Sequence, residues 1–582
     1  MLIDTRYRIP VYLSLLLCAI LCLTMNFYGV TLDEPGFLTA GRTYVVWAEH
    51  PIKHKLDSYW MYGQEHPAFG KLLGGFACYA FHDKLGTVGL FKAFRLQNLI
   101  YCFAFCFIMY WWMQELTNKY MAVAAVLVAF FLPRMYFGAH IGMLDYPVTV
   151  LIFVSSYAFW KGLTDPRHII TASILTGLAL ATKINGAFLY AFLIVWLVIA
   201  WRKELKNRLL YILSLIAIPP ALFVLLWPWL WHHPVARILG YFVRLLHHRP
   251  IPLYYLRQTY SGDTPWHYPF VLTIATLPCL ILAAMVWYAL AARKKAIDWF
   301  LIAGALVPLA AIAFFSPCKN DGVRLFLPAF PFIAMLASLG IHEYFKRYTH
   351  AKLAIFAVIV CFSIVFAIGE YHRYQECYYN ELVAASRTEP VFETEYETCA
   401  YQELVPWLNE HPHSKLYVPV LGDHLMIHQA LGRLSTSVEC SAYKDADYVV
   451  ILEREGFFDE VAWSYRCSNR TPVFAIKEGS GIPILSVYKK YEGAERRNGT
   501  GGELGAGAIY WAALIQSSLR MHMGNERLPR WFFRHSQQMP RRSQSAFGHA
   551  HFSLLASTVQ SMKSLHSQAH EIGSRPPTLN PV

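Results

Sequence analysis

The fold is decided near the N-terminus by the stretch PVYLSLLLCAILCLTMNFYGV, residues 10–30, which runs directly into TLDEP, residues 31–35. The first stretch contains no charged side chain, and roughly 20 apolar residues are enough to cross the hydrocarbon core of a bilayer. It also lacks the small-residue cleavage site of a secretory signal peptide. We therefore predict that it forms a first membrane helix that is retained, and that two carboxylates, Asp33 and Glu34, follow its end.

The composition of the whole chain agrees with a membrane protein. Of its 582 residues, 56% are hydrophobic and 15% are charged, and the mean hydropathy is +0.33. Ordinary soluble proteins carry about 25% charged residues. The net charge of +13 would suit a nucleic-acid partner, but the basic residues form short clusters between apolar runs, as the positive-inside rule predicts. We predict that the chain resides in the lipid bilayer and has no nucleic-acid partner.

The predicted fold class is an α-helical polytopic membrane protein with about eleven transmembrane helices. Several of the candidate helices are shorter than the roughly 20 residues that a perpendicular crossing needs, so they either pack inside the bundle or extend further than their apolar runs. The apolar runs are residues 10–30, 94–113, 120–133, 146–160, 169–182, 186–201, 209–228, 267–290, 298–316, 325–343 and 353–369.

The short basic loops predict how the helices are oriented. Basic clusters at residues 202–208, 293–295 and 346–352 fall on one side of the predicted membrane, together with Arg6 and Arg8. This arrangement places the N-terminus in the cytoplasm. An odd number of spans then places everything after residue 369 outside. The predicted external loops are residues 31–93, 133–145 and 229–266.

Three regions follow from these patterns. Residues 1–369 form a predicted membrane domain, residues 370–492 have the composition of a small soluble domain, and residues 493–582 are polar, without periodicity, and predicted to be disordered. Strand-like and helix-like runs alternate in the middle region, which predicts a small extracytoplasmic α/β domain. The strand-like runs are residues 415–420, 448–452 and 482–487, and the helix-like runs are residues 402–409 and 424–431.

Carboxylates and cations gather at the predicted outer ends of the helices. Asp33 and Glu34 could simply end a helix in water, but transfer to a hydroxyl acceptor needs a carboxylate base near the reacting centre. The cations on this face are not expected from the positive-inside rule. Snorkelling would explain some of them, and binding of an anionic lipid head group would explain why they lie on this face. Lys183 is the strongest candidate among these cations for a functional role. It lies in a short polar break between two apolar runs, and a turn there needs Asn and Gly but no Lys. The outer cations are Arg134, Lys183, Lys319 and Arg324, and His140 and Asp145 lie in the same segment as Arg134.

Metal and disulfide chemistry stay open from the residues. The histidine pairs of the loop at residues 229–266 lack a carboxylate at metal-binding spacing, and a belt at the bilayer interface explains them better. No cofactor is predicted, and a divalent metal is the open alternative. Four cysteines of the α/β region permit two disulfides: Cys377, Cys399, Cys440 and Cys467.

Taken in order, these motifs resemble the C-type (GT-C) glycosyltransferases of the membrane, in particular the protein O-mannosyltransferase and aminoarabinose transferase group. The resemblance covers residues 10–410, and its downstream part departs from the family at Ala384-Ala385 and Glu397. The matching elements are Asp33-Glu34 after the first helix, His66-Pro67 before Lys71-Leu72-Leu73, Arg134 through Leu144-Asp145-Tyr146-Pro147, Gly177 through Thr182-Lys183, and Arg324-Leu325-Phe326-Leu327-Pro328.

The resemblance implies transfer of a sugar from a polyprenyl-phosphate carrier to a hydroxyl acceptor on protein, glycolipid or polysaccharide, with inversion at the anomeric carbon. It implies a protein of the bacterial inner membrane that works on the periplasmic side. Phosphate is a good leaving group, so the enzyme mainly needs a base and cations. The implied roles are Asp33 as the base, Glu34 as a second catalytic or positioning carboxylate, Arg134, Lys183 and Arg324 as phosphate ligands, and His66, His140 and Asp145 as orienting groups.

Two other classes of function are open. A secondary transporter of a lipid or small solute would also have many helices and membrane charges, but internal repeats are not evident and the charges gather at helix ends. A lipid-binding or assembly scaffold would keep its function without Asp33. The sequence has no Walker-type loop and no GxSxG elbow, which argues against ATP-driven transport and serine hydrolysis.

Overall fold

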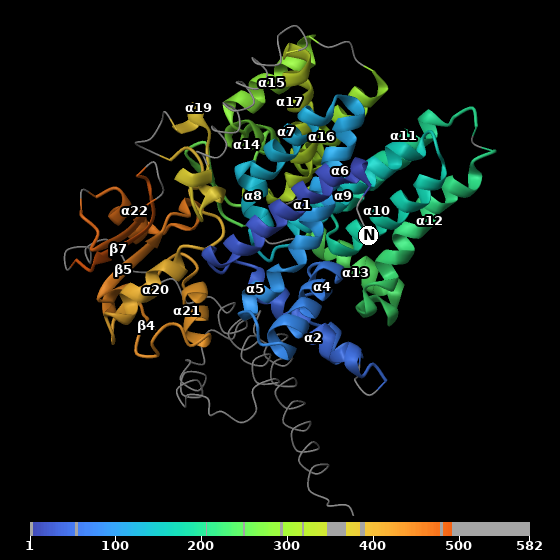
Figure 1. The fold of residues 1–582 in the computed structure, drawn as a ribbon. Coiled ribbons are helices and arrows are strands. Elements are labelled where there is room, and N and C mark those ends of the chain that lie inside the picture. The colour runs from blue at the N-terminus through green and yellow to red at the C-terminus, as the bar shows by residue number, and fades with distance from the viewer. Residues whose placement is uncertain are drawn as a thin grey trace, which may run out of the picture. The chain divides into compact units, whose positions relative to one another are not determined.

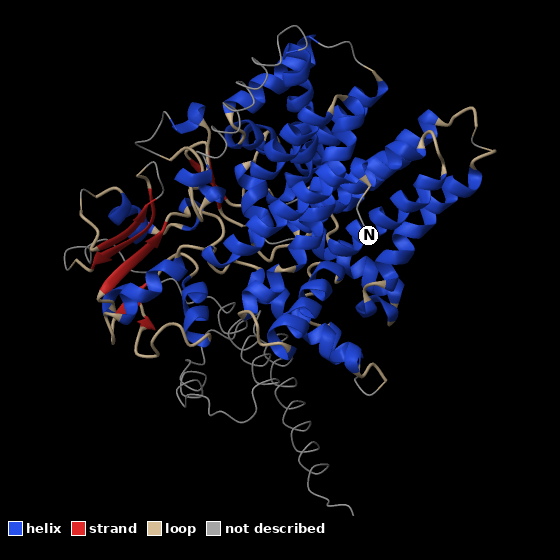
Figure 2. Ribbon diagram, viewed as in Figure 1, coloured by secondary structure: helices blue, strands red, loops and turns tan. Residues whose placement is uncertain are grey.

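The computed structural model describes residues 4–52, 56–204, 206–247, 251–291, 295–316, 319–345, 368–384, 390–468, 470–477 and 481–491. Helices dominate up to residue 345, and a five-stranded sheet lies in the C-terminal part (Figures 1 and 2). The predicted fold class, a helical membrane protein with a small α/β domain, is confirmed. The predicted tail at residues 493–582 lies outside the described residues.

Among the described residues, four helices are long and apolar enough to cross a membrane, and two bent pairs raise the number to six. Three shorter apolar helices and α9 (Asp145–Gly162) account for the remaining predicted runs, except the one at residues 353–369, which lies mostly outside the described residues. The four spans are Arg6–Phe27, Leu90–Leu116, Ala296–Phe315 and Arg324–Phe345; the bent pairs are Lys119–Phe131 with Pro133–His140 and Tyr268–Thr276 with Cys279–Leu290; the shorter helices are Arg167–Thr182, Gly186–Ala200 and Leu209–Leu225.

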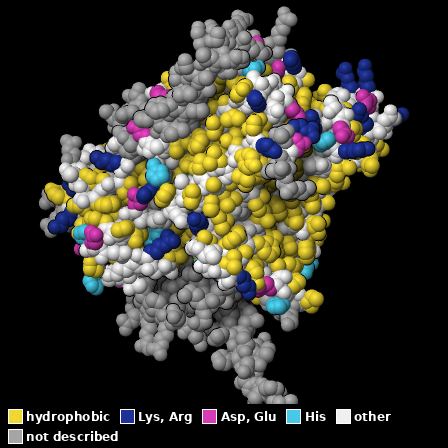
Figure 3. All heavy atoms as spheres, in the orientation of Figure 1, with side chains coloured by type: hydrophobic (Ala, Val, Ile, Leu, Met, Phe, Trp, Pro, Cys, Tyr) yellow, Lys and Arg dark blue, Asp and Glu magenta, His cyan; other side chains and the backbone are white. Residues whose placement is uncertain are grey.

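The surface agrees with a position in the bilayer. A broad apolar area covers the helical part in Figure 3, and most Lys, Arg, Asp and Glu side chains lie toward its margins. Large apolar side chains on α1 (Thr5–Thr24) and α12 (Leu209–Leu225) are exposed, including Leu16, Leu23 and Leu210. A contiguous apolar surface of this kind is costly in water and favourable in lipid.

Two prolines explain why two spans are bent. Pro133 begins α8 (Pro133–His140), and the preceding Leu132 has a non-helical backbone (φ −56°, ψ 125°), because a proline disfavours the helical conformation in the residue before it. Helix α7 (Lys119–Phe131) therefore ends there, and the chain turns by 67°. Leu277, before Pro278, likewise separates α14 (Tyr268–Thr276) from α15 (Cys279–Ala291), with a bend of 116°. The first bend matters for the site, because α8 carries Arg134 and His140.

The predicted external loops also contain helices, among them α2 (Glu34–Glu49), α3 (Leu56–Trp60), α4 (Phe69–Ala77) and α13 (Pro234–Leu246). Helix α9 packs against α10, and α10 against α12. The bounds are α2 Glu34–Glu49, α3 Leu56–Trp60, α4 Phe69–Ala77 followed by a π-helix at Cys78–Lys84, α5 Leu90–Arg95, α6 Gln97–Leu116, α9 Asp145–Gly162, α10 Arg167–Thr182, α11 Gly186–Ala200, α13 Pro234–Leu246, α16 Ala296–Phe315 and α17 Phe330–Phe345, with 3₁₀ turns at Met25–Phe27, Pro228–Trp231 and Arg324–Ala329 and a hairpin of β1 Leu253–Tyr255 and β2 Gln258–Tyr260.

The C-terminal domain is a mixed sheet in the order β4-β3-β5-β7-β6. Strand β3 pairs in parallel with β4 and β5, whereas β7 is antiparallel to β5 and β6. The central β5 has four successive buried residues, Val449 to Leu452, as a strand covered on both faces requires. The bounds are α19 Glu381–Ala384, α20 Tyr401–Asn409, β3 Lys415–Tyr417, α21 Gly422–Ala430, β4 Glu439–Cys440, β5 Tyr448–Leu452, α22 Glu460–Arg466, β6 Phe474–Lys477 and β7 Pro483–Lys489, with 3₁₀ turns at Gln375–Cys377, Tyr443–Asp445 and Glu455–Phe457.

Candidate active site

Arg324 is the centre of the site. It lies at the start of a 3₁₀ turn, Arg324–Ala329, just before the buried helix α17, and its side chain is 14% exposed. Four carboxylates from distant parts of the chain contact its guanidinium group. These are Asp33 at 2.6 Å, Glu397 at 3.3 Å, and Asp145 and Asp321 at 3.4 Å each.

Lys183 joins this cluster through Asp145. The Lys183 Nζ atom lies 2.6 Å from Asp145 Oδ1, while the other oxygen of Asp145 faces Arg324. Asp145 is the first residue of α9 and Lys183 follows the last residue of α10, so the packing of these two helices brings the pair together. Both side chains are buried, and a buried pair is stable only because each charge has a partner.

Asp33 is the most accessible carboxylate of the cluster. It occupies the N-cap position of α2 without a capping hydrogen bond from its side chain, 36% of which is exposed, whereas Asp145 and Glu397 keep 5% and 3% exposed. Its Oδ2 atom accepts a hydrogen bond from Arg324. A substrate can therefore approach Asp33 from solvent while Arg324 holds the carboxylate in place.

Arg134 contributes a cation of a different kind. It is 5% exposed, donates to the backbone oxygen of Tyr378 at 3.3 Å, and lies 5.4 Å and 5.7 Å from the ring centres of Tyr379 and Tyr396. Within the part of the chain that the structure describes, Arg134 forms no ion pair and its Nε atom has no acceptor. It lines a pocket with Arg324, so its unused donors are available to an anion.

The charged groups around the pocket come from both domains. Asp321 Oδ1 accepts from Arg454 Nη2 at 2.6 Å, and Arg454 also donates to the backbone of Tyr396. Burial acts to raise the pKa of Asp321, but the charges of Arg454 and Arg324 outweigh it and hold the pKa below its usual value. Burial raises the pKa of Glu397 to about 8 although Arg324 opposes it. Asp321 is therefore the firmly ionised link between the domains.

His424 is a further residue near Asp33. It lies on α21 of the C-terminal domain, and burial lowers the pKa of its ring to about 4, although the charge of Asp33 acts in the opposite direction. The ring is therefore neutral at neutral pH. Sequence reasoning missed His424, Glu397 and Arg454, and only the acidic run at residues 393–397 gave a signal that could have identified one of them.

Glu34, the neighbour of Asp33, points into the protein. Its two oxygens lie 2.5 Å and 2.6 Å from Arg95 nitrogens, and the first also accepts from the backbone of Gly142. Arg95 in turn donates to the backbone oxygens of Met25, Tyr28 and Gly29. Glu34 and Arg95 thus tie the end of the first span to the start of α2, and so fix the backbone that carries Asp33.

The predicted orienting histidines lie beside the cluster. His140 is fully buried, its Nδ1 contacts the Tyr136 oxygen at 2.6 Å, its Nε2 contacts Thr24 at 2.7 Å, and its ring stacks on Tyr28. His66 packs edge-on against Phe37, one turn beyond Asp33 on α2. Of the predicted residues, the structure brings together Asp33, Asp145, Lys183 and Arg324, with Arg134 at the pocket.

The histidine loop does not assemble a metal centre in the described residues. His232 contacts Asp57 at 3.3 Å, and Arg237 binds the same carboxylate at 2.9 Å. The four cysteines of the C-terminal region that could have formed disulfides are all free thiols.

Residues 77–227 match the family of dolichyl-phosphate-mannose-protein mannosyltransferases, a range that includes Arg134, Asp145 and Lys183. This confirms the resemblance to membrane glycosyltransferases that the motifs indicated. No curated protein sequence matches the chain.

Solved structures of low sequence identity are similar over much of the chain. ArnT from Cupriavidus metallidurans bound to undecaprenyl phosphate has 13% identity and a TM-score of 0.45, and the similarity covers 82% of this chain and 97% of that one. The apo state of the same protein has 12% identity and a TM-score of 0.47 over the same shares. The Archaeoglobus fulgidus oligosaccharyltransferase in complex with Zn and sulfate has 13% identity and a TM-score of 0.34, covering 68% of this chain and 55% of that one.

Proposed function

We propose that this chain is a glycosyltransferase that moves a sugar from a polyprenyl-phosphate carrier to a hydroxyl group of an acceptor. The observation that carries the proposal is a partly exposed carboxylate, Asp33, which Arg324 holds beside a cluster containing Lys183 and next to a pocket lined by Arg134. The family match supports it, because the family is named for a lipid-phosphate sugar donor. The bilayer supplies the donor, and the acceptor is a protein, glycolipid or polysaccharide.

In the proposed reaction, the hydroxyl oxygen of the acceptor attacks the anomeric carbon of the sugar. Asp33 accepts the proton of that hydroxyl as the attack proceeds. The bond between that carbon and the phosphate oxygen breaks, and the electron pair leaves with the lipid phosphate. The attack occurs opposite the leaving group, so the configuration inverts. A base of this kind contributes roughly 10²- to 10⁴-fold in rate.

Cations assist the departure of the phosphate. Arg134 has unused hydrogen-bond donors at the pocket, and we assign it the first contact with the phosphate oxygens. Arg324 and Lys183 carry positive charge into the same region and offset the charge of the leaving group. Asp145 positions both of them, since it contacts one with each oxygen.

The remaining predicted residues have supporting roles in this proposal. Glu34 positions Asp33 through Arg95 rather than sharing the proton. His66 and His140 orient the sugar or the segments around it. We further propose that the site opens to the periplasmic side of a bacterial inner membrane, as the distribution of basic loops predicts.

The proposal is tested in membranes that contain equal amounts of wild type, Asp33→Asn or Asp263→Asn. Asp263 is an exposed carboxylate in the loop before α14, so it controls for the loss of one charge. Each membrane receives polyprenyl-phosphate donors with labelled sugars and a whole-envelope extract as acceptor. We expect label to reach the acceptor with wild type and Asp263→Asn only. Label that stays on every carrier tested in all three would contradict glycosyl transfer, and equal transfer in all three would remove Asp33 as the base.

A further inference from the structure

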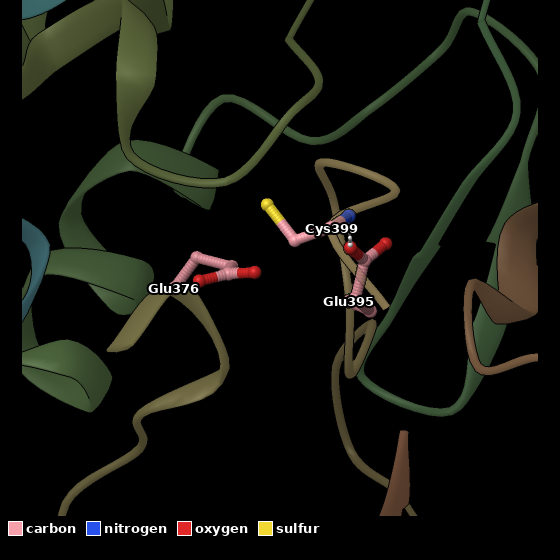
Figure 4. A group of neighbouring side chains, drawn as sticks. All are labelled: Glu376, Glu395 and Cys399. Carbon is pink, nitrogen blue, oxygen red and sulfur yellow. Dashed lines mark hydrogen bonds between the residues drawn. The ribbon is translucent and has the colours of Figure 1, made fainter. Parts of the chain in front are cut away.

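Glu376, Glu395 and Cys399 form a compact group of side chains that the proposed transfer reaction does not use. One ligand atom from each residue lies within 4.8 Å of the other two. Figure 4 shows the Glu376 carboxylate facing the Cys399 thiol and the Glu395 carboxylate across a small gap. Glu376 comes from the 3₁₀ turn Gln375–Cys377, and the other two come from the segment before α20.

All three side chains are buried, with exposed fractions of 2%, 0% and 2%. Among the described residues, neither carboxylate oxygen of Glu376 has a hydrogen-bond partner, and Glu395 Oε2 has none either. The other oxygen of Glu395 accepts from the backbone of Cys399 at 2.9 Å. Buried carboxylate oxygens are normally paired, so three unpaired oxygens on two neighbouring carboxylates beside a buried thiol indicate a ligand for this group.

The ligand that fits is a cation. Burial raises the pKa of the Glu376 carboxyl and of the Cys399 thiol well above their usual values. The charge of Glu395 raises the pKa of Glu376 further, and the charges of Glu376 and Glu395 raise the pKa of Cys399 further. Arg134 and Arg95 act in the opposite direction from outside the group, but neither forms an ion pair with these residues in the described structure. A bound cation would replace the protons and satisfy the unpaired oxygens together.

We propose that Glu376, Glu395 and Cys399 bind a divalent transition-metal ion, with Zn²⁺ as the best match. A thiolate and two carboxylates suit Zn²⁺, which accepts both sulfur and oxygen ligands, whereas Mg²⁺ and Ca²⁺ bind through oxygen alone. Three protein ligands leave a fourth position of a tetrahedral ion for water. The ion would join the turn at residues 375–377 to the segment at residues 393–400.

Such an ion would stabilise the segment that carries Glu397, which contacts Arg324 in the candidate active site. The same segment packs closely on the end of the first span, where no side chain would fit at Gly29 against the backbone of Cys399. The metal therefore has a structural role here, and the inference does not depend on the proposed sugar transfer.

The test uses the full-length protein purified in detergent, freed of metal with a chelator and then titrated with Co²⁺ and Zn²⁺. We expect a near-ultraviolet charge-transfer band when Co²⁺ binds, because a cysteine thiolate is a ligand, and displacement of that band by about one Zn²⁺ per chain. The band is lost in Cys399→Ser and weakened in Glu376→Gln. It is kept in the control Cys440→Ser, whose thiol lies outside the group.

The wild-type spectrum decides the matter even if a variant fails to fold. A wild-type protein that gives no thiolate band and takes up no Zn²⁺ would overturn the proposal. A band that persists in a folded Cys399→Ser protein, or that disappears in Cys440→Ser, would assign the metal to another thiol and would also overturn it.

Discussion

Asp33 and Glu34 are neighbours in the chain, yet their carboxylates have different surroundings. Asp33 faces solvent and Arg324, whereas Glu34 is fully buried against Arg95. A pair of acidic residues at a helix start can therefore divide its tasks, one residue for chemistry and one for the position of the backbone. We therefore expect loss of the Asp33 charge to lower activity and loss of the Glu34 charge to lower stability.

We predict that Glu34→Gln destabilises the protein by about 3–5 kcal/mol, because Arg95 would be left buried without its counter-charge. The measurement is thermal unfolding of the purified protein, with Glu410→Gln as the control. Glu410 is exposed, and its substitution should leave the unfolding temperature nearly unchanged. Equal unfolding temperatures for the two variants would contradict the structural role of Glu34.

Two lysines that pair with carboxylates provide a second comparison at this scale. Lys183 is buried with Asp145, whereas Lys161 is 37% exposed beside Glu115. We predict that Lys183→Met lowers kcat/KM for the lipid donor by about 10- to 100-fold, the value of one charge-assisted hydrogen bond, and that Lys161→Met changes it little. Kinetics with a soluble short-chain donor would measure both. Similar values for the two variants would exclude Lys183 from donor binding.

At the scale of elements, helix ends position the site. Asp145 starts α9, Lys183 follows α10, Asp33 occupies the N-cap position of α2, and Pro133 turns α8 out of line with α7 so that Arg134 reaches the pocket. These local features could be predicted, because carboxylates at helix starts, a lysine in a short break and prolines inside apolar runs are visible in sequence.

The partners of these residues could not be predicted in the same way. Arg324 meets Asp33 across 291 residues and Arg454 meets Asp321 across 133 residues, and no spacing rule reaches that far. The sequence suggested phosphate as the partner of Arg324, and the structure adds four carboxylates. Glu397 and Arg454 were missed because the region after residue 369 had the composition of a separate domain, although its loops complete the cluster.

Helix α21 gives a prediction about pH. Burial lowers the pKa of His428 from 6.5 to about 4, with the charge of Arg433 and the neighbouring His424 acting in the same direction. The unfolded chain therefore binds more protons than the folded chain between these values, and stability falls as the pH drops below about 6.5. We predict a loss of about 3 kcal/mol from this residue by pH 4.

The measurement is the unfolding temperature between pH 7 and pH 4 for wild type, His428→Gln and the exposed control His413→Gln. The acid-induced decrease should be smaller in His428→Gln than in the other two. An identical decrease in all three proteins would show that His428 does not contribute to acid sensitivity.

At the scale of the whole molecule, contacts between the two domains constrain which side of the membrane each faces. The ion pairs from Arg324 to Glu397 and from Asp321 to Arg454 join the helical part to the α/β domain. The end of the helical part that carries Asp321 and Arg324 must therefore face the same compartment as the α/β domain. The basic loop at residues 202–208 is predicted to face the compartment on the opposite side of the membrane.

This topology predicts a labelling pattern for a membrane-impermeant thiol reagent on intact cells. The exposed Cys467 of the C-terminal domain should react, and the signal should disappear in Cys467→Ser. A cysteine placed in the basic loop of that variant, as Lys203→Cys, should react only after the membrane is opened. If the cysteine of Lys203→Cys reacts in intact cells, the predicted orientation is wrong.

The central claim is that Asp33 acts on the acceptor proton and not on donor binding. The measurement is steady-state kinetics of wild type and Asp33→Asn with a polyprenyl-phosphate sugar that the wild type uses. We predict that kcat falls by about 10²- to 10⁴-fold while the donor KM stays within a few fold. An unchanged kcat, or a raised KM with kcat preserved, would contradict it.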